Sequence, residues 1–134
     1  MRAYRARSPA PPDAVCALLA QPARWSEWAP HIRGAWGLGA PEVRDGARGA
    51  VRLLGLLPVP AAIVAKQAGR EWTWVVPAGV RMIHRVEPYD SGSLITIELE
   101  APGPLEPALA ATYGPLVQLL LRRLASVSAA ATAR

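Results

Sequence analysis

Turn signals recur about every ten residues between His31 and Val86, and this spacing constrains the fold more than any other feature of the chain. The signals are 39–41, Asp45-Gly46, Leu57-Pro58, Ala68-Gly69 and 77–79. Intervals of this length are typical of short strands joined by tight turns. The stretch therefore predicts an antiparallel meander.

Polarity alternates along 80–86, which tells the two faces of one strand apart. One set is expected on the inner face of the sheet: Val80, Met82, His84 and Val86. The arginines of the other set, Arg81 and Arg85, would then face water, because successive side chains of a strand point to opposite faces. This alternation predicts that the imidazole of His84 points inward.

Two neighbouring stretches show the same alternation. Trp72 and Trp74 share one side of 71–76, which we take to be the inner side, and Glu71 and Thr73 face the other way. After a turn at 90–92, the stretch 93–101 predicts a last strand. Its inward residues are Ile95, Ile97 and Leu99, and its outward residues are Thr96, Glu98 and Glu100.

The N-terminal part combines an edge strand with two short helices. Charged residues alternate along 2–7, which suits a strand at the edge of a sheet. A helix is expected from Pro11 or Pro12 to about Ala20, because proline is tolerated in a first helical turn. A second, short helix is expected from Pro22 to Trp28, and Pro30 ends it.

The C-terminal part predicts one long amphipathic helix over 105–128. Its apolar stripe is Leu109, Tyr113, Leu116, Leu120, Leu124 and Val127. Pro115 lies inside this stretch and removes a backbone hydrogen bond, so a kink is expected near Gly114. The last six residues are expected to fray.

Length and composition indicate a single domain over residues 1–134. The apolar fraction of 51% is too high for a disordered chain. The single cysteine, Cys16, has no partner in its own chain, so we expect a reducing cytoplasm. The N-terminus lacks the apolar run of a signal peptide, and the longest apolar stretch, 51–65, is too short to span a bilayer.

The formal net charge of +5 comes from scattered arginines. A nucleic-acid surface would need basic residues clustered on one face with aromatic residues between them, and only Arg2, Arg5 and Arg7 or the Arg122-Arg123 pair approach this. An Ala/Arg/Gly/Pro-rich composition also accompanies high-GC bacterial genomes. We therefore expect no nucleic-acid partner.

The order strand, two short helices, meander and long helix carries the segment Pro22-Ala-Arg-Trp25-Ser-Glu-Trp28-Ala-Pro30. With this order and segment, the chain resembles the polyketide cyclase/dehydrase branch of the START-like (SRPBCC) superfamily over nearly its whole length. The resemblance implies an α+β helix-grip fold, in which a curved antiparallel sheet of about seven strands wraps around a long C-terminal helix. It also implies a cavity between sheet and helix, of the kind that binds lipids, sterols, polyketides, quinones and plant hormones.

Candidate site residues follow from which side chains face that cavity. The expected ligand-binding set is Trp36, Trp72, Trp74, Met82, His84, Ile97, Leu109, Tyr113 and Leu116. Within it, His84 is the candidate general base and Tyr113 the candidate hydrogen-bond donor to a carbonyl. Trp25 and Trp28 are expected to fix the short helix in place. His31 has no second ligand at metal-binding spacing, so neither a metal nor another cofactor is expected.

Three functions remain open at this point. The first is a carrier or sequestering protein for a small hydrophobic or aromatic molecule. The second is a cyclase or dehydratase that uses His84, although few polar groups converge on one point as such chemistry requires. The third is a protein-interaction module, and a homodimer is one assembly that remains open.

Overall fold

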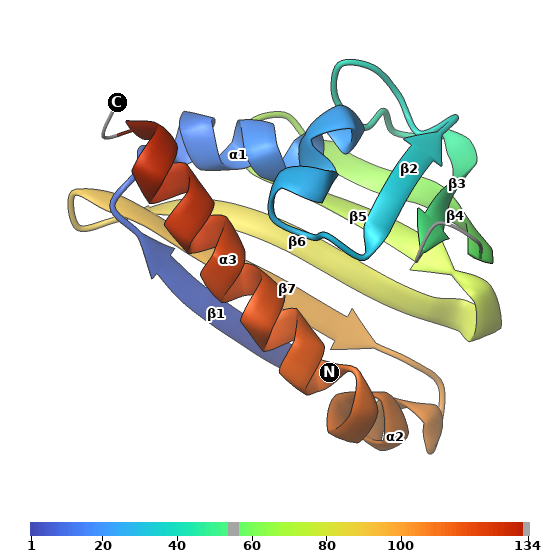
Figure 1. Ribbon diagram of the computed structural model, residues 1–134. Helices are drawn as coiled ribbons and strands as arrows, with labels where there is room; N and C mark the ends of the chain where they lie inside the picture. The colour runs from blue at the N-terminus through green and yellow to red at the C-terminus, as the bar shows by residue number, and fades with distance from the viewer. Residues whose placement is uncertain (54–56, 133–134) are drawn as a thin grey trace.

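The computed structural model describes residues 1–53 and 57–132, and it consists of one curved sheet with its helices on the concave side (Figure 1). The strands are β1 (Arg2–Ser8), β2 (Ile32–Trp36), β3 (Arg48–Leu53), β4 (Leu57–Gln67), β5 (Glu71–Val76), β6 (Val80–Tyr89) and β7 (Gly92–Glu100). They form a seven-stranded sheet in the order β1-β7-β6-β5-β4-β3-β2, and every pairing is antiparallel. The expected meander and helix-grip fold are confirmed.

One predicted turn was wrong, because Leu57 and Pro58 lie inside β4. Proline cannot donate to a strand ladder and is therefore confined to places with a free side. Pairing between β4 and β5 begins only at Ala62, so Pro58 and Pro60 lie where β4 has β3 as its one neighbour. The connection between β3 and β4 falls on residues 54–56, outside the described residues.

Two short helices follow β1, as expected. The first, α1, spans Pro12–Ala20 and has proline in its first turn, and the second, η1, is a 3-10 helix over Pro22–Glu27. The indole Nε1 of Trp25 donates to the carbonyl of Leu19 at 2.8 Å, and that of Trp28 donates to the carbonyl of Leu18 at 2.9 Å. These carbonyls lie at the end of α1, where no intrahelical partner remains. Both tryptophans therefore fasten η1 to α1.

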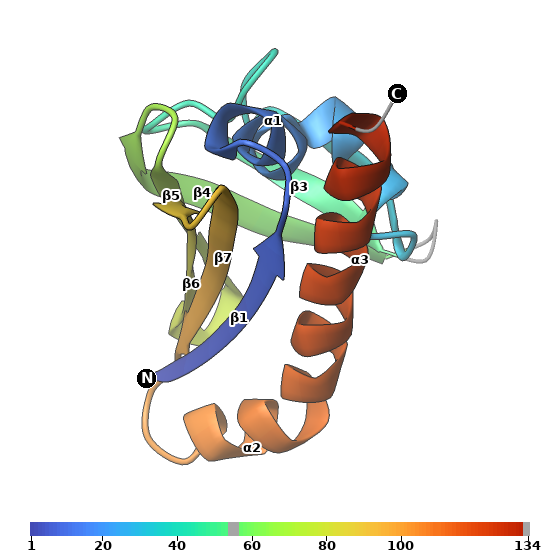
Figure 2. The ribbon, with the colours of Figure 1, turned by 90° about the vertical axis from the view of Figure 1, so that its left-hand side faces the viewer.

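The expected C-terminal helix is divided in two. A short helix, α2, covers Leu105–Thr112, and α3 begins anew at Gly114 and ends at Thr132. Figure 2 shows α2 turned across the end of α3. Pro115 is thus the second residue of a new helix, where its missing N–H costs nothing, and a full break replaces the expected kink. The tail stays helical to Thr132, and residues 133–134 lie outside the described part.

The interior is solid where α1 meets the C-terminal half of α3. Fully buried side chains fill this end, among them Val15, Leu18, Val86, Ile95, Leu121 and Leu124. A buried hydroxyl pair joins the end of β1 to α3, since the Oγ atoms of Ser8 and Ser128 lie 2.7 Å apart. This packing holds the C-terminal half of α3 against the sheet.

On the convex face of the sheet, Arg85 points outward as predicted. It is half-buried there and donates to Glu98 at 2.8 Å and to Glu71 at 3.4 Å. The register explains this, because Glu71 and Arg85 are direct cross-strand partners between β5 and β6. Among the described helices, none has the length and hydrophobicity required to cross a membrane.

Candidate functional site

A cavity of about 230 Å³ lies between the sheet, η1 and the helices α2 and α3. The strands contribute Ile32, Val51, Leu53, Val59, Trp72, Trp74, Val76, Val80, Met82, His84, Ile97 and Leu99 to its wall. The helices and connections contribute Trp25, Trp28, Ala29, His31, Leu109, Tyr113, Val117 and Leu120. Within the described part of the chain, this wall contains no Asp, Glu, Lys or Arg.

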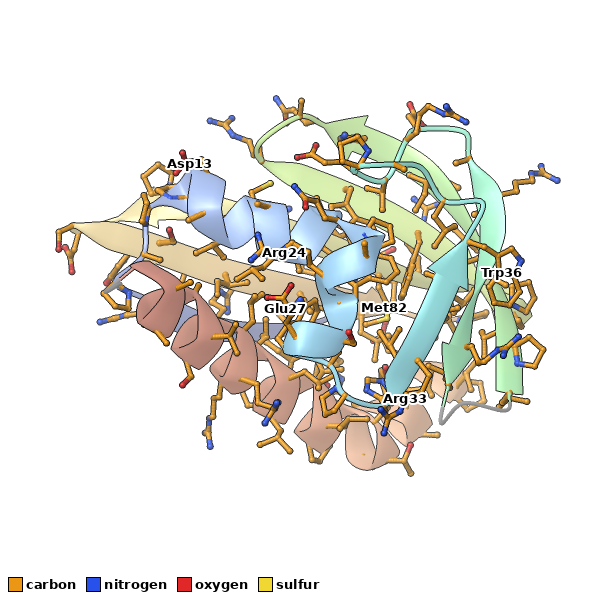
Figure 3. All side chains as sticks on the ribbon, turned by 45° about the horizontal axis from the view of Figure 1, so that its top comes forward. Asp13, Arg24, Glu27, Arg33, Trp36 and Met82 are labelled. Atoms are coloured by element: carbon orange, nitrogen blue, oxygen red, sulfur yellow. The ribbon has the colours of Figure 1, made fainter. Side chains whose placement is uncertain are left out.

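Most of the residues expected in the site meet at this cavity. They are Trp72, Trp74, Met82, His84, Ile97, Leu109 and Tyr113, and Figure 3 shows Met82 in the interior under η1. Trp36 and Leu116 are not among the lining residues. The alternation of β5, β6 and β7 was therefore a sound guide, and the two residues left out belong to other elements.

Trp36 lies on the opposite face of the sheet. It pairs with Ala50 of β3, whereas the cavity-lining Val51 points the other way, so the Trp36 indole reaches the convex surface. Trp36, which is labelled in Figure 3, is 48% exposed. Its ring centroid lies 5.7 Å from the guanidinium carbon of Arg52. The correction arises from register, since nothing in the short β2 sequence fixes which face looks inward.

Leu116 is half-buried and packs against the core without lining the cavity. The inward face of α3 is centred on Val117, Leu121 and Leu124, which are 0–1% exposed. Val117 and Leu120 line the cavity in its place. The predicted stripe was correct for Leu120 and Leu124, and it chose Leu116 where the neighbouring Val117 faces the cavity.

Three indoles form one cluster on the cavity wall. The rings of Trp25 and Trp72 stack at 5.7 Å between centroids, and Trp74 meets both edge-on at 5.6 and 5.4 Å. Aromatic pairs at these separations are mutually stabilising. Trp25 and Trp28, which were expected to fix the short helix in place, are also part of the cavity wall. Their place in the Trp25-Ser-Glu-Trp28 segment gave no sign of this.

His84 packs within this cluster. Its ring stacks on that of Trp72 at 3.7 Å with 10° between the planes, and its Nδ1 lies 3.2 Å from the carbonyl oxygen of Trp72. A carbonyl oxygen can only accept, so Nδ1 carries the proton and Nε2 keeps its lone pair. The side chain is buried, as the alternation predicted.

Burial also fixes the charge state of the polar side chains of the wall. Loss of solvent lowers the pKa of His84 to about 3, against a smaller opposing effect of the Trp72 carbonyl. Burial lowers the pKa of His31 and raises that of Tyr113 in the same way. Both imidazoles and the phenol are therefore neutral at pH 7. Within the described residues, no three His, Cys, Asp or Glu side chains gather as a metal-binding group.

Three buried polar atoms of the wall have no hydrogen-bond partner among the described residues. They are Nε1 of Trp72, Nε1 of Trp74 and Nδ1 of His31. An unsatisfied buried donor costs about 1–3 kcal/mol, and native proteins hold few of them. All three atoms belong to residues that line the cavity, although each atom itself has almost no exposed surface.

The sheet, the broken C-terminal helix and the apolar cavity between them define a START-like helix-grip domain. The chain belongs to the family described as polyketide cyclase / dehydrase and lipid transport, whose model matches residues 3–129. A sequence search against curated proteins finds no match.

Solved structures share this fold at low sequence identity. Protein NE0264 from Nitrosomonas europaea superposes with a TM-score of 0.76 at 15% identity, covering 95% of this chain and 92% of that one. Ara h 8.0201 gives 0.71 at 16%, with 95% of each chain covered. The Aha1 dimer from Colwellia psychrerythraea gives 0.65 at 12%, covering 93% and 97%. At such identities the likeness establishes the fold alone.

Proposed function

We propose that this protein binds a small hydrophobic or aromatic organic molecule in the cavity between its sheet and its C-terminal helices. The observation that supports this most directly is the cavity itself, with its wall of apolar and aromatic side chains. Burial of apolar surface contributes roughly 25 cal/mol per Å², so a guest of matching shape gains affinity without charged contacts. The family description, which includes lipid transport, agrees with this role.

Binding can be measured with the tryptophans of the wall. A panel of lipids, quinones and aromatic polyketides is titrated into the protein while tryptophan emission and melting temperature are recorded. A ligand at a hundredfold excess over its Kd stabilises the native state by about 2.7 kcal/mol, which appears as a rise of several degrees. A panel in which no compound changes either signal contradicts the proposal.

A cyclase or dehydratase is the second candidate, because His84 brings an imidazole with a free Nε2 to the cavity wall. A general base works best with a pKa near the working pH, and burial has made this imidazole a much weaker base. Binding therefore ranks first. If the protein turns over a compound from the panel, His84→Ala lowers that turnover about 100-fold in the enzyme and leaves it unchanged where His84 acts only as wall.

Assembly and location belong to the same proposal. A reducing, cytoplasmic setting agrees with Cys16, which is buried and not bonded to another cysteine. A homodimer is consistent with one solved structure of the same fold, the Aha1 dimer. Light scattering on the purified protein distinguishes the monomer from the dimer.

A further inference from the structure

The cavity wall contains two kinds of indole. The N–H groups of Trp25 and Trp28 donate to backbone carbonyls at the end of α1. Those of Trp72 and Trp74 are buried and have no partner among the described residues. The second pair belongs to alternate residues of β5 whose side chains line the cavity, but the N–H groups themselves have almost no exposed surface, so a guest reaches them only when the rings tilt. Trp25 and Trp28 thus use their N–H groups to stabilise the fold, whereas the N–H groups of Trp72 and Trp74 have no such use.

The same wall disfavours an ionised guest. No lining residue in the described part of the chain carries a formal charge, so nothing there balances a carboxylate or a phosphate. Burial lowers the pKa of both lining histidines, His31 and His84, which therefore stay neutral. A donor without a counter-charge suits a neutral acceptor such as a carbonyl oxygen.

We infer that the cavity selects an uncharged, ring-sized apolar molecule with a carbonyl-type oxygen, which accepts hydrogen bonds from the indole N–H groups of Trp72 and Trp74. A carbonyl oxygen has two lone pairs and can accept from either donor or from both. The free Nε2 of His84 adds one acceptor to the wall for a hydroxyl on the same molecule. This inference rests on the proposed binding function and adds the residues that give it chemical specificity.

Three probes of one ring system test it: 1-acetylnaphthalene, 1-ethylnaphthalene and ionised 1-naphthoate. The first two have side groups of similar size and differ in the carbonyl, whereas the third carries a negative charge. Isothermal titration of the whole protein is expected to give the acetyl compound an affinity about tenfold above that of the ethyl compound, with naphthoate weakest. Equal affinities for the acetyl and ethyl compounds, or tightest binding of naphthoate, overturn the inference while cavity binding stands. Binding of none of the three overturns this inference, whereas the proposed function falls only if the wider panel of lipids, quinones and polyketides also gives no signal.

Variants assign the preference to particular donors. Trp72→Phe and Trp74→Phe each remove one N–H and keep an aromatic face, so each is expected to reduce the acetyl-to-ethyl affinity ratio by severalfold. Trp28→Phe is the matched control, because its N–H is already engaged with Leu18. Trp28→Phe can change both affinities, but it should leave the acetyl-to-ethyl affinity ratio unchanged. A ratio that survives in both test variants overturns the assignment.

A measurement on the unaltered protein covers variants that fail to fold. The chain has five tryptophans, so its indole N–H groups give five resonances in an ¹⁵N-labelled sample. Addition of 1-acetylnaphthalene is expected to move the resonances of Trp72 and Trp74 downfield, as new hydrogen bonds do, while 1-ethylnaphthalene does not. Equal shifts with both probes overturn the inference.

Discussion

At the scale of single residues, His84 shows how burial decides chemistry. Its imidazole stacks on Trp72, donates its Nδ1–H to the Trp72 carbonyl and is only 4% exposed. The side chain type that usually titrates near neutral pH is thereby held neutral. His84 is therefore a neutral hydrogen-bonding group of the wall, and its protonation would destabilise the fold.

The free-energy cost of protonating His84 in the folded state predicts a pH dependence of stability. The unfolded chain protonates His84 below its ordinary pKa of 6.5, whereas the folded chain resists protonation until about 3. Stability is therefore complete above pH 6.5 and is lost as the pH falls between these values, at about 1.4 kcal/mol per unit. In urea unfolding, the protein should lose about 2 kcal/mol more than His84→Gln between about pH 7.5 and about pH 5. Parallel pH profiles for the two proteins would refute this account.

At the scale of elements, polar contacts join segments far apart in the chain. The indoles of η1 close the end of α1, and the hydroxyl of Ser128 in α3 donates to the carbonyl of Ala125 at 3.0 Å and meets Ser8 of β1. Ser8 in turn accepts from the N–H of Ala10. Each contact satisfies a group that the packing of helices on the sheet removes from water.

The serine pair gives a prediction with its own control. Ser128→Ala removes one hydrogen bond of the buried Ser8 hydroxyl, which keeps the N–H of Ala10 as a donor, and should lower the free energy of unfolding by about 1 kcal/mol. Ser126→Ala, on the exposed side of the same helix, should change it by less than about 0.5 kcal/mol. Chemical denaturation of the two variants measures both, and equal effects would show that the pair adds nothing.

At the scale of the whole molecule, the same sheet and the same helix α3 form both the filled core and the wall of the cavity. On α3, Val117 lines the cavity and Leu121, one turn later, is fully buried in the solid core. The helix therefore passes from one region to the other within a single turn. Stability and binding can be separated along its length.

Paired substitutions test this division. Val117→Phe extends into the cavity and should weaken binding of 1-acetylnaphthalene at least tenfold, with a melting temperature that is unchanged or higher by a few degrees. Leu121→Phe overpacks a filled core and should cost about 1–3 kcal/mol. Calorimetry with and without the probe measures both effects. Similar destabilisation by the two variants would mean that the two ends are packed alike.

The sequence predicted the architecture well because the fold depends on periodicity. Alternation over 71–101 placed Trp72, Met82 and Ile97 on the correct face, and the position of Pro115 indicated the disturbance near Gly114. These are local signals, in which each residue reports on its own element. Such signals are sufficient to define strands, helices and their order.

What the sequence missed depends on contacts between elements. The face of Trp36 is set by its register with Ala50, and the role of Trp25 in the cavity wall is set by its stacking on Trp72. The unused N–H groups of Trp72 and Trp74 could not be told from the engaged ones, since the partners of Trp25 and Trp28 lie in another helix. The sequence therefore predicted where the cavity lies. Its hydrogen-bonding groups depend on contacts between elements, which only the folded structure shows.

The indole cluster has an optical consequence. Transition dipoles on three rings with centroids 5.4–5.7 Å apart, in fixed orientations, couple strongly to one another. Light absorbed by one ring is therefore shared by all three, and the chiral arrangement gives an exciton couplet in circular dichroism. This circular dichroism signal therefore reports on the interior of the protein and changes when any one of the three rings tilts.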